Sequence, residues 1–145
     1  MKPDEFYALA LRLVAVGKTA ECRSALSRAY YSAAHVAKET LESMGVRLPP
    51  GNNMNSLIPN LLSNSNDPRL SRAGHRLREI QSKRIKADYK LSDRESENAK
   101  SVAVWIADAG EVIQIVQETF SGKNAIIVIA SIQSYIKLVY NFPAN

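Results

Sequence analysis

Apolar side chains recur at intervals of three and four residues along nearly the whole chain. This spacing places them on one face of an α-helix, so the pattern predicts a helical protein. The stretch 70–91 follows the spacing most regularly, and the stretch 99–120 repeats it. We expect helices over residues 4–16, 19–44, 54–62, 67–91, 92–122 and 123–141.

Residues that favour helix starts and stops stand at several of these boundaries. Gly17 follows the first helix, where glycine readily takes the left-handed conformation of a C-terminal cap. Asp67 followed by Pro68 is a favourable start, because the carboxylate caps free N–H groups and proline has none to satisfy. Ser92 with Glu95 three residues later is typical of a capping box, so we expect the next helix to begin there.

The last segment, 123–141, supports two interpretations. The β-branched run 126–129 favours a strand, whereas the apolar positions from Ile129 to Val139 repeat at helical spacing. We choose the helix, because a single strand would have no partner in this chain. That helix either packs on the core or faces a second subunit.

Together these elements predict an all-α fold, an antiparallel up-down bundle of four long helices with additional short helices. We expect a single domain over 1–145, with its core at about 4–120 and a C-terminal helix over 123–141. The first helix is expected to face inward with Phe6, Leu9, Leu13 and Val16.

Arg84 interrupts the apolar stripe of the fourth expected helix. The guanidinium does not lose its charge in proteins, so its place among core positions requires a partner. Asp88 lies one turn further along and can supply a carboxylate. A structural ion pair and a functional site both fit this pattern. The stripe consists of Leu70, Ala73, Leu77, Ile80, Arg84, Ala87 and Leu91.

The chain's positive charge is concentrated in the same helix. The net charge is +5, and residues 67–91 contain eight Lys or Arg against three acids, which accounts for the whole excess. A basic stripe of this kind attracts phosphates, although a merely soluble helix surface would look the same. It should line a solvated face and consists of Arg69, Arg72, Arg76, Lys83, Lys86 and Lys90.

Composition limits the other possibilities. The single cysteine, Cys22, excludes an internal disulfide and fits a reducing cytoplasm. The longest apolar run, 125–130, is too short to span a membrane, and the first residues do not resemble a signal peptide. We find no phosphate-binding glycine loop and no metal motif, so no cofactor or metal is expected. We therefore expect a cytoplasmic protein.

A second polar face lies on the expected helix 19–44. Arg28, Tyr31 and His35 follow one another at helical spacing, and the outer two are about 10 Å apart along the axis. A polar face this close to a core stripe should meet another polar group, and Arg84 with Asp88 is the natural candidate. The alternative is that Arg28 and His35 are simply solvated.

Two sequence strings resemble the bacterial and archaeal branch of the HEPN superfamily. Residues 25–35 read ALSRAYYSAAH and residues 84–89 read RIKADY, and the resemblance covers about 4–120. It implies an all-α bundle that usually dimerises and that binds or acts on RNA or nucleotides. Many HEPN proteins work beside a nucleotidyltransferase in toxin–antitoxin pairs, and others belong to phage-defence systems.

Catalytic HEPN proteins are metal-independent endoribonucleases with an arginine followed by a histidine and often a tyrosine. Arg84 and Tyr89 fit that motif, but Asp88 stands where the histidine would be. An aspartate is ordinarily ionised near neutrality and is poorly suited to shuttle a proton there.

Three hypotheses follow from the resemblance. The first is a dimeric module that binds RNA or a nucleotide, or a nucleotidyltransferase partner, without strong catalysis. The second is an endoribonuclease that uses Arg84, Asp88 and a recruited His35 or His75. The third is a scaffold without a ligand. The residues that we expect to bind the ligand are Arg28, Tyr31, His35, Arg84, Asp88 and Tyr89.

Overall fold

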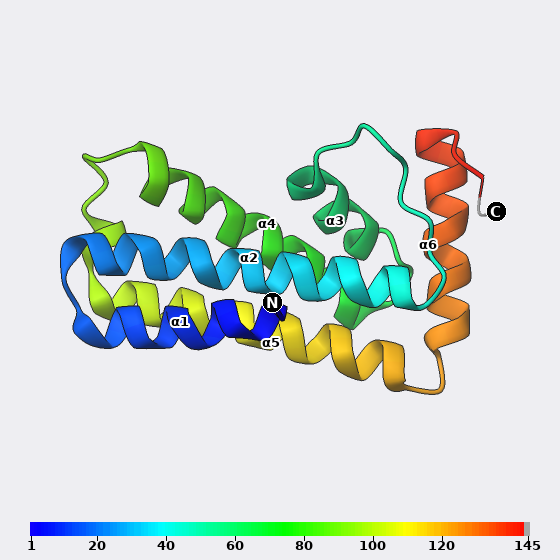
Figure 1. Cartoon of the computed structure of the whole chain (residues 1–145). Coiled ribbons are helices and arrows are strands. Elements are labelled where there is room, and N and C mark those ends of the chain that lie inside the picture. The colour runs from blue at the N-terminus through cyan, green and yellow to red at the C-terminus, as the bar shows by residue number, and fades with distance from the viewer. Residues whose placement is uncertain (144–145) are drawn as a thin grey trace.

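The computed structural model describes residues 1–143, and this part of the chain is helical without strands. The predicted all-α fold is therefore confirmed. Successive long helices run in opposite directions side by side, and the last helix crosses one end of the bundle (Figure 1). The elements are α1 (Pro3–Val16), α2 (Thr19–Ser43), α3 (Met54–Ser63), α4 (Pro68–Tyr89), the 3₁₀ helix η1 (Glu95–Glu97), α5 (Ala99–Ser121) and α6 (Ala125–Tyr140).

Helix α2 is the central element, because it contacts α1, α4 and α5. Small side chains make this possible, since they let several neighbouring helices approach the same backbone. Larger side chains, Leu26, Tyr30 and Leu41, fill the space between the helices and are fully buried. The fully buried alanines of this helix are Ala25, Ala29, Ala33, Ala34 and Ala37.

Helices α3 and α4 approach each other closely at a glycine. A Cβ atom on Gly74 would lie only 2.6 Å from the backbone nitrogen of Ser63. Glycine is therefore the residue that fits between the two backbones. At the start of α4 the expected cap forms, because Asp67 Oδ1 accepts a hydrogen bond of 2.8 Å from the Leu70 N–H.

The helix start expected at Ser92 is wrong. Residues after α4 form a turn and then η1, and α5 begins only at Ala99. The side chain of Asn98 caps it by accepting a hydrogen bond of 3.1 Å from the Ser101 N–H. Helix α4 also ends before Leu91, which is 76% exposed and does not belong to the buried stripe.

The inward face expected for α1 is wrong in part. Ala10 is the fully buried residue of this helix, whereas Val16 is 55% exposed. Tyr7 lies on the inner side, where its hydroxyl donates a hydrogen bond of 3.2 Å to the Ile106 carbonyl. Leu13 packs against the core as expected, and Leu9 and Leu13 also line a groove on α2. Apolar residues cover much of the circumference of α1, so their spacing alone could not show which of them face the core.

The C-terminal helix is confirmed, and one of its faces packs on the bundle. Val128, Ile132 and Ile136 are buried there. On the remaining surface of α6, Ile126 and Leu138 are more than 80% exposed. Within residues 1–143, the structure has no helix with both the length and the apolar character needed to cross a membrane.

Candidate functional site

Arg84 is buried, as its position in the stripe predicts, with 6% of its surface exposed. Its guanidinium carbon lies 5.3 Å from the ring centre of Tyr30 and 5.4 Å from that of Tyr31. The negative faces of the two rings stabilise the cation, an interaction that strengthens where water is excluded. The arginine of α4 is therefore held against the tyrosine pair of α2.

Hydrogen bonding to Arg84 is incomplete. Asp88 supplies its one ion pair among the described residues, with 3.4 Å between Arg84 Nη1 and Asp88 Oδ2. The Nε–H of Arg84 is buried and has no acceptor within residues 1–143. A guanidinium has five N–H donors, and a buried donor without an acceptor costs about 1–3 kcal/mol. The residue thus retains unused hydrogen-bonding capacity.

Tyr30 has a structural role beside this arginine. Its hydroxyl donates a hydrogen bond of 2.7 Å to Asn55 Oδ1 at the start of α3. Burial raises the pKa of the Tyr30 hydroxyl well above its ordinary value, and the charge of Arg84 lowers it only in part. Tyr30 therefore stays a neutral phenol near neutrality and is not a general base.

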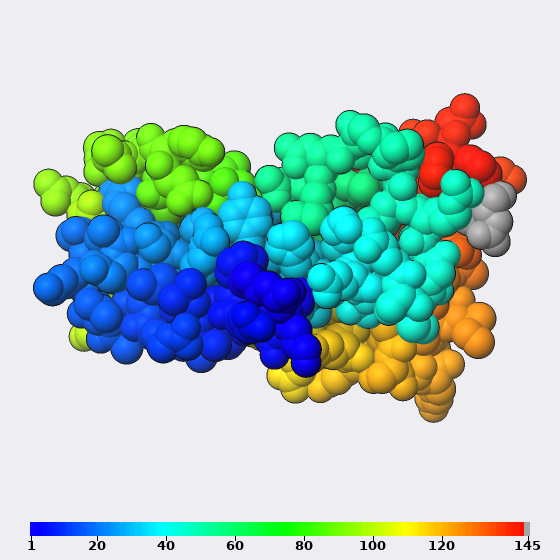
Figure 2. Space-filling model, viewed as in Figure 1, coloured from blue at the N-terminus to red at the C-terminus, as the bar shows by residue number. Residues whose placement is uncertain are grey.

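Asp88 connects Arg84 to an open groove. The Ser27 hydroxyl donates a long hydrogen bond of 3.4 Å to the same Oδ2 atom. The groove lies between α1, α2 and the end of α4, where a strip of α2 remains uncovered (Figure 2). Its lining residues are Leu9, Leu13, Ser24, Ser27, Arg28 and Asp88.

Arg28 lies between two aromatic rings at this groove. Its guanidinium carbon is 5.0 Å from the ring centre of Phe6 and 5.6 Å from that of Tyr31. Tyr31 therefore contacts both Arg28 and Arg84. Cations and aromatic rings alternate across the interface of α1, α2 and α4, and we call this group of side chains the cation–aromatic stack. It consists of Phe6, Arg28, Tyr31, Arg84 and Tyr30.

The two other expected site residues lie apart from the Arg84–Asp88 pair. The ring centre of His35 is 6.3 Å from those of Tyr31 and Phe6, and His35 lines a separate pocket at the N-terminus. Within residues 1–143 it makes no hydrogen bond to Arg84 or Asp88. Tyr89 is 77% exposed. The structure thus groups Arg28, Tyr31, Arg84 and Asp88, with His35 at the border.

Sequence reasoning missed Arg23, the most completely hydrogen-bonded cation of the described chain. Its guanidinium donates to four backbone carbonyl groups and to Glu97 Oε1, at distances of 2.9–3.1 Å. The signal was present, because Arg23 lies seven residues before Tyr30 and so shares its helix face. The carbonyl groups that it contacts belong to Ala87, Lys90, Leu91 and Asp93.

The basic stripe of α4 is less free than its pattern indicates. Arg69 pairs with Glu118 at 2.6 Å and Arg76 pairs with Asp108 at 2.8 Å, both across the contact with α5. Lys83 lies 4.7 Å from the ring centre of Trp105. This flank of α4 faces α5, whereas Arg84 faces α2, so the stripe and the groove are separate surfaces. The expected solvated face is present, because no residue of the stripe is buried, but several of its charges are paired.

No group of three or more His, Cys, Asp or Glu side chains that could hold a metal ion occurs within residues 1–143. Comparisons of the chain with protein-family models, with curated proteins and with solved structures find no match. The geometry and the chemistry of the groove are therefore the basis for a functional hypothesis.

Proposed function

We propose that the chain is a HEPN-type module that binds RNA or a nucleotide and has no strong catalysis of its own. In this proposal it acts as a homodimer beside a nucleotidyltransferase, or in a toxin–antitoxin or phage-defence setting. The support from sequence is the pair of strings at 25–35 and 84–89, which carry the resemblance. Both strings contribute residues to one groove.

The main observation behind the proposal is the state of Arg84. A buried charge that serves stability alone is normally well hydrogen-bonded, because burying it otherwise costs free energy. Arg84 has one long contact and an unsatisfied Nε–H. An unsatisfied buried donor requires an explanation, and its place next to a groove that contains its carboxylate partner supports a binding site.

The groove offers the contacts that a single-stranded nucleic acid needs. Arg28 is held by the faces of Phe6 and Tyr31, and its in-plane N–H donors remain available for a phosphate oxygen. Leu9 and Leu13 give the groove apolar lining, against which the face of a base can pack. Asp88 and Ser27 can exchange hydrogen bonds with the edge of a base, as carboxylates do with amino groups.

The same geometry argues against proton transfer at this site. The position of the motif histidine is taken by Asp88, whose carboxylate contacts the Arg84 cation. His35 is separated from that pair by the ring of Tyr31. Arg28 in the groove can hold a phosphate, but without a positioned acid or base it does not by itself cleave the RNA backbone.

Incubation with total RNA in EDTA separates the three hypotheses. We expect no cleavage, and we expect binding that weakens steeply as salt rises, because phosphate contacts release counterions. Arg84→Ala should reduce this binding, and His35→Ala should reduce it less. Cleavage that Arg84→Ala abolishes would instead support the endoribonuclease, and neither binding nor cleavage would leave only the scaffold.

A further inference from the structure

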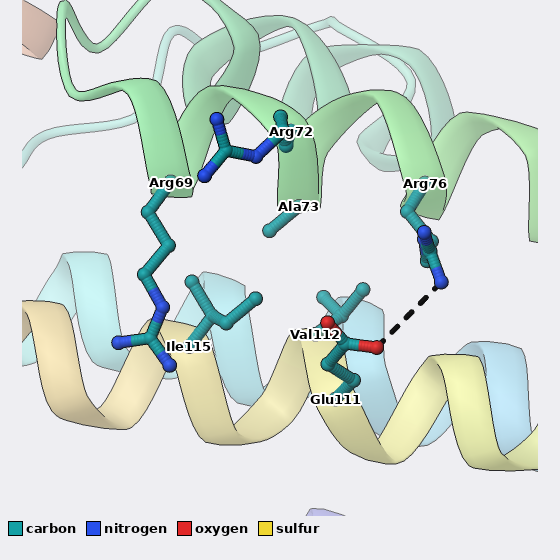
Figure 3. Close-up of a pocket in the computed structure, with 7 residues that line it drawn as sticks. All are labelled: Arg69, Arg72, Ala73, Arg76, Glu111, Val112 and Ile115. Atoms are coloured by element: carbon teal, nitrogen blue, oxygen red, sulfur yellow. Dashed lines mark ion pairs between the residues drawn. The ribbon is translucent and has the colours of Figure 1, made fainter.

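A pocket lies on the other flank of α4, between this helix and α5 (Figure 3). Three arginines of α4 stand around it at spacings of three and four residues. The opposite side is formed by α5. The lining residues are Arg69, Arg72, Ala73, Arg76, Glu111, Val112 and Ile115.

Two of the arginines form the sides of the pocket. Arg69 reaches across to Glu118 at 2.6 Å, and Arg76 reaches across to Asp108 at 2.8 Å. Arg69 pairs with one carboxylate and Arg76 also lies near that of Glu111, but both guanidinium groups keep other N–H donors unused. Figure 3 shows the two side chains extending from α4 toward α5 with the hollow between them.

Arg72 is the third arginine and has no such partner. No carboxylate of residues 1–143 lies within ion-pair distance of it, and none of their side chains accepts a hydrogen bond from it. Its side chain projects from the top of the hollow in Figure 3, between Arg69 and Arg76. This cation is therefore available to an anion that enters the pocket.

The floor of the pocket sets the size and type of ligand. Ala73, Val112 and Ile115 are buried beneath it, and an apolar floor strengthens ionic contacts above it. The cavity of about 140 Å³ is below the range of about 300–1,000 Å³ that is usual for whole organic ligands. It accommodates one small group.

We propose that this pocket is a second binding site, separate from the groove, and that it takes one phosphate group. Guanidinium groups match phosphate oxygens as paired donors. Three guanidinium groups at one pocket offer more N–H donors than the two oxygens of a planar carboxylate can use, and they suit the four oxygens of a tetrahedral phosphate better. The phosphate is free inorganic phosphate or the end of a phosphate monoester.

Glu111 opposes the ligand in this proposal. Its carboxylate lies 3.6 Å from Arg76 Nη1, further than Asp108, and its side chain is 57% exposed. It can therefore turn into solvent while Asp108 still holds Arg76. An entering phosphate displaces the Glu111 carboxylate from Arg76, so removing its charge should strengthen binding.

Titration of the full chain with inorganic phosphate, followed by calorimetry at constant ionic strength, tests the site. We expect Arg72→Gln to weaken binding about tenfold, because it removes the unpaired cation. Glu111→Gln should tighten binding about threefold, since the competing charge is gone. Lys86→Gln is the matched control, because it removes one positive charge from the same helix outside the pocket.

Parallel titrations with glycerol 3-phosphate and with acetate identify the ligand chemistry. Binding of glycerol 3-phosphate at least as tight as that of phosphate indicates a monoester, and binding of phosphate alone indicates the free ion. Equal binding by Arg72→Gln and Lys86→Gln would overturn the proposal, and so would acetate binding as tightly as phosphate. Arg72→Gln should cause the same loss of phosphate binding in an Arg28→Gln background, so the test of the pocket is independent of RNA binding in the groove.

Discussion

Arg23 and Arg84 both lie on apolar helix stripes and are both buried, yet their hydrogen bonding is opposite. Arg23 donates to four carbonyl groups and a carboxylate. Arg84 donates once, over 3.4 Å, and relies on two tyrosine rings. Buried charge alone is therefore a weak signal of function. The extent to which the donors are satisfied separates a structural arginine from a candidate binding residue.

Replacement of Asp88 tests the ion pair at the residue scale. Asp88→Ala should lower the free energy of unfolding by about 1–2 kcal/mol, because it leaves a buried guanidinium without a counter-charge. The double variant Arg84→Leu with Asp88→Leu should fold with nearly unchanged stability, since no buried charge remains. Urea unfolding measures both. A double variant that is less stable than Asp88→Ala would show that Arg84 is mainly a structural residue.

Replacement of Arg23 tests whether a fully hydrogen-bonded buried arginine stabilises the fold. Arg23→Met should lower the free energy of unfolding by about 3–5 kcal/mol, because it leaves several carbonyl groups without a donor and removes the nearer of the two cations beside Glu97. Arg12→Met, at an exposed position of α1, is the control and should change stability by less than about 0.5 kcal/mol. A cost for Arg23→Met as small as that of the control would refute this role.

At the scale of elements, the segment between α4 and α5 shows where local signals fail. Ser92 and Asn98 are both acceptable helix starts, and the chain uses Asn98. Arg23 donates a hydrogen bond of 2.9 Å to the Asp93 carbonyl group, which a helix starting at Ser92 would need as one of its own acceptors. Spacing within one helix cannot reveal such a contact from another helix.

The same segment makes stability depend on pH. Above all, the hydrogen bond that Ser96 donates lowers the pKa of the Asp93 carboxyl below its ordinary value. A carboxyl group whose pKa is lower in the folded than in the unfolded protein stabilises the fold at pH values above its ordinary pKa. This contribution is lost as the pH falls through the lowered pKa of the folded state. Ser96→Ala should therefore cost more stability near pH 7 than near about pH 3, as urea unfolding at the two pH values can show. An equal cost at both would contradict this linkage.

At the scale of the whole molecule, periodicity was sufficient for the helices and for the burial of Arg84. The periodicity did not show which helices pack side by side, because that arrangement depends on contacts between segments distant in the sequence. The pairing of Arg69 with Glu118 and the position of Leu9 beside Arg28 are of this kind. From the sequence, the groove could therefore be predicted only as a contact between the polar face of Arg28 and His35 and the pair Arg84–Asp88.

The oligomeric state is a further prediction at this scale. Large apolar side chains at both ends of α6, such as Ile126 and Leu138, are exposed, and a second copy of the chain could cover them. We expect a homodimer of twice the chain's 16.0 kDa. Sedimentation equilibrium measures this mass directly, and a monomer at all concentrations would exclude the dimer.

Binding of a single-stranded oligoribonucleotide, followed by fluorescence anisotropy, tests the central claim most directly. Arg28→Gln should weaken binding about tenfold and reduce the slope of log affinity against log salt by about one, because one phosphate contact is lost. Lys137→Gln removes the same charge from α6 and should bind within about twofold of the unmodified chain. If Arg28→Gln binds as tightly as Lys137→Gln, the cation–aromatic stack is not a nucleic-acid site.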